Sequence, residues 1–362
     1  MCPSRRGQAA YDGRMAAPRR RVRMREVAEH AGVSTSTVSH VLNGTRFVSP
    51  ATQAAVLAAA EELGYELPET VEIAPSRRTL GIAISSYSNP YMAELIQGVE
   101  QEAIRAGFAL FLCDSHDNPK QESEAVRTLL THHVDAIVLA PTSQWEETAL
   151  PLLHKGGRPY VLIDRLSASP CDQVVCDSAS ATATLIEHLI GHGHHRIGMV
   201  SGLPGLSTSQ ERLRGYQRAL VDAGLAVDEH LVRCGHSSAS GGRAAVHSLL
   251  RNEPRPTAIF SANNAMTVGA LQAFDELGIR VGDDVALVGF DDFEWASAVR
   301  PALTTVAQPF HAMGARAVQL LLHRLENPMA AHRVVRLPTE IQYRDSCGCP
   351  PLDRRFPEAP RN

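Results

Sequence analysis

Several features that would assign a function at once are missing from this 362-residue sequence. No apolar run approaches the roughly 20 residues that a membrane-spanning helix needs, so no membrane partner is expected. Residues 1–23 contain basic side chains but no apolar core, and we therefore expect no secretory signal and a cytoplasmic protein. The hydrophobic content of 44% nevertheless supplies a sizeable core, and the length favours two or three domains.

Common catalytic and metal-binding motifs are also missing. We find no nucleophile elbow, no paired catalytic carboxylates and no phosphate-binding glycine loop, because GLPG at 202–205 carries a proline and predicts only a turn. The seven cysteines lack metal-type spacing, apart from Cys347 and Cys349, whose single intervening residue is too short for a zinc knuckle. The string GHGHHR at 191–196 leaves a metal site open, although we favour a solvent-facing turn. We expect no catalytic residue, no metal, no cofactor and seven free thiols.

Positive charge is concentrated in the N-terminal part of the chain, although the chain as a whole is acidic. The net charge is −4, yet the sequence through Arg46 contains nine arginines against three acidic residues. Lysine occurs only at positions 120 and 155. A basic head on an acidic body is typical of a DNA-binding module carried by a separate sensor.

The segment REVAEHAGVSTSTVSHVLNGTRFV at 25–48 predicts two short helices joined by a turn. Gly32 suits the turn, and Ser34 suits the cap of a second helix that runs to about Leu42. On that helix, short hydrogen-bonding side chains face outward in place of the Glu and Lys of a solvated face; they are Thr35, Ser36, Thr37, Ser39 and His40. Such a face fits base edges and phosphates.

A third helix is predicted to begin at Ser49-Pro50 and to end at Gly64. Its expected buried stripe consists of Val56, Ala59, Ala60 and Leu63. Three short helices within residues 22–65 predict an all-α helix-turn-helix headpiece, preceded by a disordered basic tail at 1–21.

Strands and helices alternate from residue 80 onward, which predicts parallel sheets with helices on both faces. The expected strands are Leu80–Ser85, Phe108–Cys113, Ala136–Ala140, Tyr160–Ile163, Ile197–Ser201, Ala258–Ser261 and Val285–Phe290. We predict one two-lobed α/β domain over 80–346, with the lobe boundary near 177, crossovers near 308 and 337, and a tail at 347–362.

Polar residues follow the predicted strands where a cleft between the lobes would lie. They are Asp164-Arg165, Arg212, Asn263-Asn264 and Asp291-Asp292. An Asp after a strand is more often a turn or cap residue than a ligand contact, but the group together predicts a site for a polyhydroxylated ligand.

Two sets of motifs resemble the LacI/GalR family of bacterial transcription regulators. VAEHAGVS, TVSHVLN and ELGY resemble its headpiece, and the stretch STSTVSHVLNGTRFV is closest to the purine-repressor branch. VLIDR, RLRGY, PTAIFSANNAM and DVALVGFDDFEWA resemble its sensor domain, which is itself similar to periplasmic sugar-binding proteins.

The resemblance implies roles for individual residues of the headpiece. By position, the base readers would be Thr35, Ser36 and His40, and the phosphate contacts would be Thr37, Ser39, Asn43 and Ser49. Many members have arginine at the position of His40. Because a neutral histidine makes a single bond where arginine makes two, a softer preference for guanine is expected.

The linker at 66–79 departs from the family pattern Y-x-P-N-x-x-A-R-x-L. Ala74 stands at the position of the leucine that wedges into the minor groove, and Ile73 is a substitute only after a one-residue shift. Glu69 and Glu72 would repel phosphates. We therefore expect weak operator bending.

In the sensor domain, the family's effector-binding residues match Asp164, Arg212, Asn263 and Asp291, with Gln308 and Phe310 on the same wall. Tyr91 falls where purine-sensing members have an aromatic residue, but Leu206 replaces their purine-contacting arginine. A sugar or sugar derivative is therefore the expected effector. Trp295 either covers the pocket or packs between the lobes.

The resemblance implies a homodimeric repressor, without enzyme activity, that binds a palindromic operator under the control of this effector. A transport sugar-binding protein and an α/β enzyme with an attached head are the alternatives. The headpiece and the missing catalytic motifs disfavour both.

Overall fold

The chain forms two compact units, residues 1–76 and 77–362, and each is described by itself. The computed structural model describes residues 22–43, 48–65, 78–85 and 90–348, and the side chains of residues 43, 90 and 91 lie outside this description. The predicted hinge residues Ile73 and Ala74 also lie outside it. The first strand begins at Arg78, within the range predicted for the linker.

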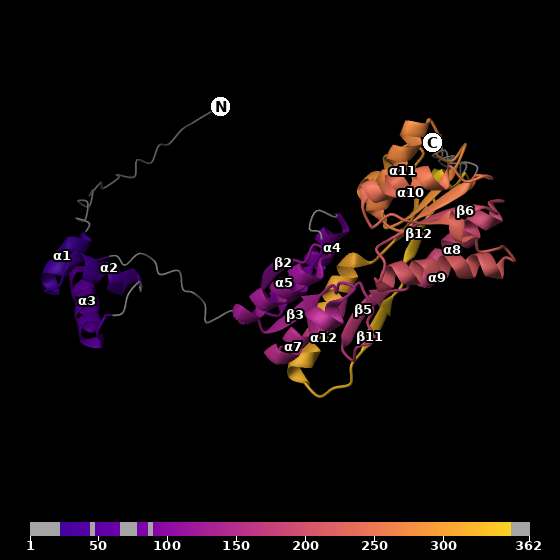
Figure 1. Ribbon diagram of the computed structural model, residues 1–362. Coiled ribbons are helices and arrows are strands. Elements are labelled where there is room, and N and C mark those ends of the chain that lie inside the picture. The colour runs from indigo at the N-terminus through magenta and orange to yellow at the C-terminus, as the bar shows by residue number, and fades with distance from the viewer. Residues whose placement is uncertain (1–21, 44–47, 66–77, 86–89, 349–362) are drawn as a thin grey trace, which may run out of the picture. The chain divides into compact units, whose positions relative to one another are not determined.

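The first unit is a bundle of three helices, α1 (Met24–His30), α2 (Thr35–Asn43) and α3 (Pro50–Leu63) (Figure 1). Gly32 makes the turn at φ +64°, and the Ser34 hydroxyl accepts a bond of 3.1 Å from the Thr37 amide, which confirms the predicted cap. Ser49 caps α3 in the same way, through a 3.3 Å bond from the Thr52 amide. One small core joins the helices through Val27, Ala28, Val38, Val56, Ala59 and Ala60.

The second unit contains two lobes, each built on a six-stranded sheet. In lobe 1 the strand order is β11-β5-β4-β3-β1-β2, and every neighbouring pair is parallel. The strands are β1 (Arg78–Ile84), β2 (Phe108–Asp114), β3 (Ala136–Leu139), β4 (Tyr160–Ile163), β5 (Asp172–Cys176) and β11 (Val334–Leu337). Helices α4 (Pro90–Arg105) and α12 (Phe310–Glu326) cover one face; α5 (Pro119–Thr131), α6 (Trp145–Thr148) and α7 (Leu150–Gly156) cover the other.

Lobe 2 has the strand order β12-β10-β9-β8-β6-β7. Its strands are β6 (Ile197–Ser201), β7 (Val232–Cys234), β8 (Ala258–Ser261), β9 (Ala286–Phe290), β10 (Thr304–Ala307) and β12 (Glu340–Gln342). Helices α8 (Ser178–Gly191) and α9 (Ser207–Asp222) pair with each other, as do α10 (Ala239–Leu249) and α11 (Asn264–Leu277) (Figure 1). The prediction of a two-lobed α/β domain with parallel sheets is confirmed, although β12 joins its sheet antiparallel to β10.

The chain passes between the lobes at residues 176–178, 307–310 and 337–340. The second passage returns the chain to lobe 1 as α12, which packs closely on α4. A Cβ on Gly98 would clash with the His311 carbonyl oxygen, and one on Gly314 would clash with that of Leu95. Glycine at both positions therefore permits this close helix contact.

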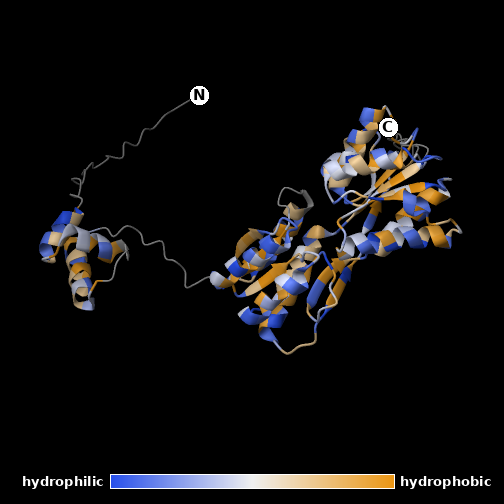
Figure 2. Cartoon of the chain, in the orientation of Figure 1, coloured by the Kyte–Doolittle hydropathy of each residue, from blue (hydrophilic) through white to orange (hydrophobic). Residues whose placement is uncertain are grey.

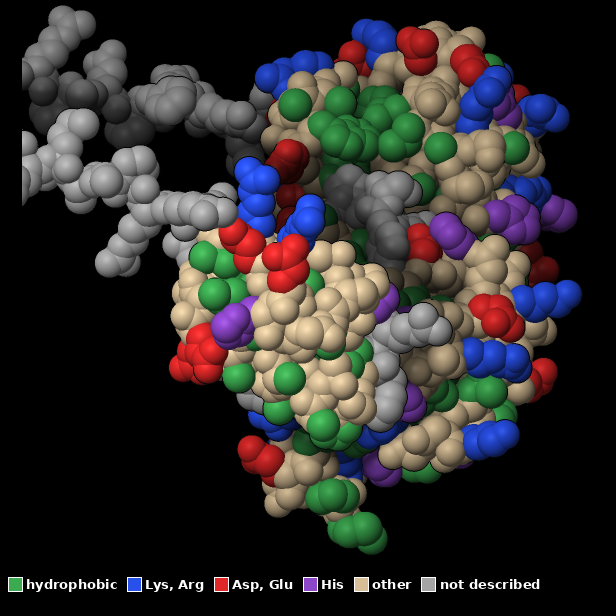
Figure 3. Space-filling view, turned by 90° about the vertical axis from the view of Figure 1, so that its left-hand side faces the viewer, with side chains coloured by type: hydrophobic (Ala, Val, Ile, Leu, Met, Phe, Trp, Pro, Cys, Tyr) green, Lys and Arg blue, Asp and Glu red, His purple; other side chains and the backbone are tan. Residues whose placement is uncertain are grey.

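Hydrophobic residues follow this layering, because the strands of both sheets carry the apolar side chains that the helices cover (Figure 2). Acidic and basic side chains are interspersed over the described surface seen in Figure 3. Among the described helices, none is both long and apolar enough to cross a membrane. The expectation of seven free thiols is wrong for Cys347, which is disulfide-bonded.

Candidate functional site

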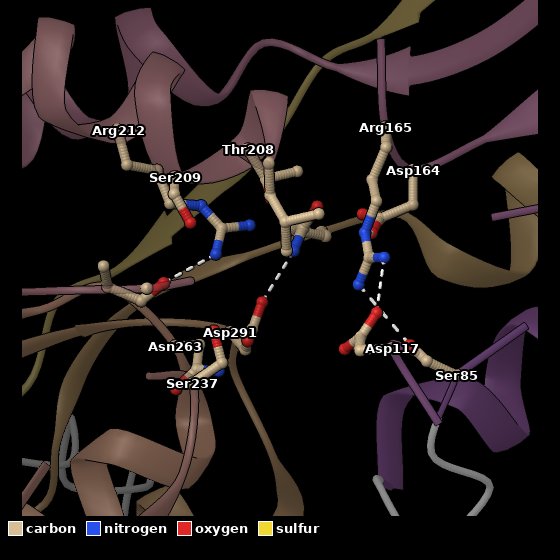
Figure 4. A pocket seen from close by; sticks show the side chains of 14 residues that line it. Ser85, Asp117, Asp164, Arg165, Thr208, Ser209, Arg212, Ser237, Asn263 and Asp291 are labelled. Atoms are coloured by element: carbon tan, nitrogen blue, oxygen red, sulfur yellow. Dashed lines mark hydrogen bonds and ion pairs between the residues drawn. The ribbon is translucent and has the colours of Figure 1, made fainter. Parts of the chain in front are cut away.

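A cavity open to solvent lies between the two lobes of the second unit, with about 570 Å³ of empty space in and around it, open solvent included. Its lining comes from the loops that follow the strands and from the start of α9 (Figure 4). The lining residues are Ser85, Asp117, Asp164, Arg165, Gly202, Leu206, Thr208, Ser209, Arg212, Ser237, Ala262, Asn263, Asp291 and Gln308. Because both lobes contribute, a ligand bound here would hold them together.

The structure brings five of the seven predicted effector residues to this cavity, namely Asp164, Arg212, Asn263, Asp291 and Gln308. Phe310 does not line it: this side chain is 3% exposed and packs in the core of lobe 1. Its place at the start of α12 turns the ring towards the sheet. The side chain of Tyr91 lies outside the described residues.

Asn264 and Asp292, the second residues of two predicted pairs, support the site but do not line the cavity. The backbone amide of buried Asn264 donates to Asp291 Oδ2 at 3.2 Å. Asp292 accepts bonds from Arg344 at 2.7 Å and from Thr305 at 2.6 Å. Both residues thus fix the segments that carry Asn263 and Asp291.

Two aspartates take the left-handed backbone conformation at the ends of their strands. Asp164 follows β4 at φ +69°, and Asp291 follows β9 at φ +76°. This conformation stores of order 1–3 kcal/mol of strain at a non-glycine residue and is concentrated at binding sites. The tight turn aims both carboxylates into the cavity, one from each lobe.

Arg212 is held flat against an aromatic ring. Its guanidinium carbon lies 3.7 Å from the centroid of Phe290, and Nη1 donates to the carbonyl oxygen of Ala262 at 2.6 Å. The Nε atom is shielded from solvent and has no partner among the described residues. The guanidinium is therefore fixed in place and keeps donor capacity for a ligand.

Arg165 organises the lobe 1 side of the cavity. Its Nη1 donates to Asp117 Oδ1 at 2.5 Å and to the carbonyl oxygen of Pro141 at 3.0 Å, and Nη2 lies 3.4 Å from Ser85 Oγ. Figure 4 shows these side chains together on one side of the cavity, opposite Arg212. Ser85 and Asp117 were not among the predicted site residues, although they follow β1 and β2 as Asp164 follows β4.

Burial raises the pKa of Asp164, against the opposing influence of Arg165 and Arg212. The ionised carboxylate is therefore costly at this position. A ligand with hydroxyl donors would lower this cost, since a hydrogen bond to the charged form favours it.

A hydrogen-bond relay crosses between the lobes beneath the cavity. Burial raises the pKa of Cys176 to about 12, so the thiol stays neutral and donates to Gln308 Oε1 at 2.7 Å. Because Oε1 accepts this bond, Nε2 of the same amide is the atom that donates to Asp291 Oδ1 at 2.6 Å. Cys176 at the end of β5 thereby orients an aspartate of lobe 2.

In the headpiece, α2 carries the predicted DNA contacts except Ser49, which caps α3. Thr35, Ser36 and Ser49 are exposed, and Thr37, Ser39 and His40 are half-buried. The Ser34 hydroxyl lies 2.8 Å from those of both Ser36 and Thr37, so the three hydroxyls form one hydrogen-bonded cluster at the start of α2. Asn43 ends α2, and its side chain lies outside the described residues.

Comparison with known proteins connects both units to one family. The model of bacterial regulatory proteins of the lacI family matches residues 23–67, and that of a periplasmic binding protein-like domain matches residues 186–347. The HTH-type transcriptional repressor PurR of Photobacterium profundum is 34% identical over 328 residues, which cover 89% of this chain and 98% of the relative. The chain belongs to the lacI family of bacterial regulatory proteins.

Solved structures of the lacI family extend the match over both units. A CelR–cellobiose complex aligns with a TM-score of 0.68 and 32% identity, over 90% of this chain and 100% of the other. A Lac repressor dimer, bound to operator and the anti-inducer ONPF, aligns with a TM-score of 0.68 and 28% identity, over 91% of this chain and 99% of the other. As a lacI-family member, the chain is a DNA-binding transcription regulator and not an enzyme, as the sequence predicted.

Two further interpretations of the sequence concern aromatic and imidazole side chains. Trp295 packs against Phe293 at the edge of the lobe 2 core, with ring centroids 3.8 Å apart, and does not line the cavity. The GHGHHR string forms a turn between α8 and β6, with His192 and His195 exposed. No group of His, Cys, Asp and Glu in the described part of the chain is arranged to hold a metal ion.

Proposed function

We propose that this protein is a transcriptional repressor whose operator binding is controlled by a neutral sugar bound between the two lobes. One observation carries the proposal: Asp164, Arg212, Asn263 and Asp291 come from separate segments and converge on one cavity. Carboxylates, an amide and a guanidinium fixed in place are the groups that bind vicinal hydroxyls in pairs.

The balance of charge in the cavity favours a neutral ligand. Asp117, Asp164 and Asp291 contribute three carboxylates, whereas Arg165 and Arg212 contribute two guanidinium groups. An added phosphate would meet an excess of negative charge at short range, which is unfavourable where water is excluded. Sugar hydroxyls can donate to the same carboxylates, so they suit this lining better.

Relatives support a sugar more than a nucleobase. The CelR structure, which has the same fold, carries cellobiose. The similarity to PurR does not decide the ligand. Leu206, at the position of the purine-contacting arginine, places an apolar side chain in the wall of the cavity.

We infer that sugar binding stabilises the closed arrangement of the lobes. Arg336 of β11 reaches Glu211 of α9 at 3.1 Å, and a Cβ on Gly205 would lie 2.9 Å from Ser143 Cβ of lobe 1. The lobes therefore already touch at the rim of the cleft. A ligand that binds both lobes shifts the population towards this arrangement and changes how the headpieces meet DNA.

A homodimer in the cytoplasm fits this mechanism. The aligned Lac repressor is a dimer bound to operator. Two headpieces related by a twofold axis require a palindromic site, with half-sites about one or more helical turns apart. We propose the same arrangement for this chain.

The proposal is tested by a thermal-shift screen of neutral sugars on the full chain, followed by footprinting of the DNA upstream of its own gene. We expect a sugar to raise the melting temperature by mass action, and a palindromic footprint whose strength changes with that sugar. A footprint without any sugar response would refute the effector. Absence of a protected palindrome would refute the operator assignment.

A second experiment tests His40 as a base reader. Replacing His40 with Ala is expected to weaken operator binding by about 10-fold, since one base contact is worth about 1–3 kcal/mol. Substituting 7-deazaguanine for each operator guanine should weaken the original protein at one position and leave His40→Ala unaffected there. Glu61→Gln, at an exposed position of α3, is the control. Equal losses in both proteins at every guanine would contradict base reading by His40.

The hydrogen-bond relay between the lobes gives a further expected result. Cys176→Ala removes the donor that orients Gln308, so sugar affinity should fall by about 3- to 10-fold, the cost of one hydrogen bond. Cys176→Ser keeps a donor and should restore most of the affinity. Cys171→Ala, which removes another buried thiol, should leave the affinity unchanged. Equal losses in the serine and alanine variants, measured by calorimetry, would show that packing alone matters.

A further inference from the structure

One fully buried carboxylate of lobe 1 lies near the cavity but does not line it. Glu122 belongs to the first turn of α5, and its side chain is shielded from solvent. A buried charge is costly unless hydrogen bonds or an opposite charge compensate it. Burial raises the pKa of Glu122, while the bonds from Thr142 and the charge of Arg165 oppose this shift. The contacts of the carboxylate therefore indicate its role.

Both oxygens of Glu122 hold the loop that follows β3. Oε1 accepts from the backbone amide of Thr142 at 2.6 Å, and Oε2 accepts from the hydroxyl of the same residue at 2.9 Å. An ionised carboxylate accepts at both oxygens, so it suits two donors from one residue. Hydrogen bonds to a charged acceptor are about twice as strong as neutral ones. The main chain of this loop is therefore fixed to α5.

The loop held by Glu122 contacts Arg165, which lines the cavity. Pro141 directly precedes Thr142, and its carbonyl oxygen accepts from Arg165 Nη1 at 3.0 Å. The same Nη1 donates to Asp117 Oδ1 at 2.5 Å, and Asp117 lies two residues before the start of α5. The contacts thus form a closed ring that runs from α5 through the loop after β3 to Arg165 and back to α5. Glu122 closes this ring on the side away from the cavity.

We propose that Glu122 is a positioning residue of the effector site, which places Arg165 at the cavity by holding the loop after β3. Only 6% of the Arg165 side chain is exposed, and its Nη2 lies 3.4 Å from Ser85 Oγ (Figure 4). Arginine loses much rotamer freedom when it is fixed, so contacts that fix it before a ligand binds lower the entropic cost of binding. This inference rests on the proposed sugar site.

Four variants of the full chain separate positioning from charge and from packing. Glu122→Ala removes both bonds to the loop. Glu122→Gln removes the charge but accepts from the Thr142 amide through its oxygen and donates to the Thr142 hydroxyl through its nitrogen. Thr142→Val removes only the hydroxyl, so it supplies a second test if Glu122→Ala does not fold. Glu124→Gln is the matched control, because Glu124 lies on the same helix with 73% of its side chain exposed.

Hydrogen exchange of the protein without sugar tests whether Glu122 holds the loop. We expect the amides of residues 140–144 to exchange at least about 10-fold faster in Glu122→Ala, because the loop opens more often when its anchor is lost. Thr142→Val should show a smaller increase in the same segment. Glu122→Gln should stay within about threefold of the original protein, and Glu124→Gln should not differ from it. Unchanged exchange of this segment in Glu122→Ala and Thr142→Val would overturn the proposal.

Calorimetry with D-glucose, D-galactose, D-ribose and cellobiose tests whether the loop matters for the site. For a sugar that binds the original protein, affinity should fall about 10-fold in Glu122→Ala and stay within about threefold in Glu122→Gln. Equal losses in both variants would assign the effect to charge and overturn positioning. A lower melting temperature with unchanged affinity in Glu122→Ala would show a role in folding alone and overturn it too. If none of these sugars binds the original protein, the proposed sugar site fails, while hydrogen exchange still decides whether Glu122 holds the loop.

Discussion

Arg212→Lys is expected to abolish sugar control of operator binding while leaving binding to operator without sugar unchanged. Lysine keeps the positive charge but loses the planar group that lies over Phe290 and bonds to the Ala262 carbonyl. Its single ammonium cannot present two parallel donors to adjacent hydroxyls. A site that leaves buried polar partners unpaired loses of order 10²-fold or more in affinity.

The measurement is calorimetry with the sugar found in the screen, together with operator binding in its presence and absence. Arg214→Lys is the matched control, because Arg214 lies on the same helix with 63% of its side chain exposed. The control should bind sugar as the original protein does. Sugar affinity in Arg212→Lys within about threefold of the original would mean that charge alone is required at this position, against the geometry of the site.

The sequence predicts much of this site through one rule, because the carboxyl ends of parallel strands meet at one edge of a sheet. Asp164, Asn263 and Asp291 follow predicted strands, and all three line the cavity. The same rule, applied to the strands that end at Ile84 and Asp114, would have found Ser85 and Asp117. Serine and aspartate are common in loops, so neither residue by itself indicates a binding site.

Other features depend on contacts between distant segments that no local pattern contains. Ser237 follows β7, a strand of three residues that is too short to predict from periodicity. Phe310 follows Gln308 closely in the chain, yet the start of α12 turns it into the core of lobe 1. The bond from Cys176 to Gln308 joins residues 132 positions apart. Only the assembled lobes bring such pairs together.

The headpiece and the cleft also differ in how directly the sequence describes them. Capping serines and turn glycines act within a few residues, so Ser34, Ser49 and Gly64 could be assigned from their neighbours in the chain alone. The cleft needs two sheets, three chain passages and a helix start to come together. The DNA-binding unit can therefore be predicted from local patterns, whereas the sensor is specified by its topology.

Asp164→Asn is expected to separate stability from function within the cleft. Burial raises the pKa of Asp164, so the folded protein holds the ionised carboxylate less favourably than the unfolded chain does. The stability that this group contributes is present below its unfolded pKa and is lost as the pH rises through its folded pKa. Asparagine removes that loss and tolerates the positive φ at this position.

The asparagine variant should therefore melt above the original protein at pH 8, and the difference should shrink towards pH 5. Sugar affinity should fall by about 10- to 100-fold, because a hydrogen bond to a charged group is worth about 1.5–3 kcal/mol. Asp275→Asn, at an exposed position on α11, should change neither quantity. If Asp164→Asn instead melted below the original protein at pH 8, attraction to Arg165 and Arg212 would outweigh the burial cost, and the carboxylate would be part of the scaffold as well as the site.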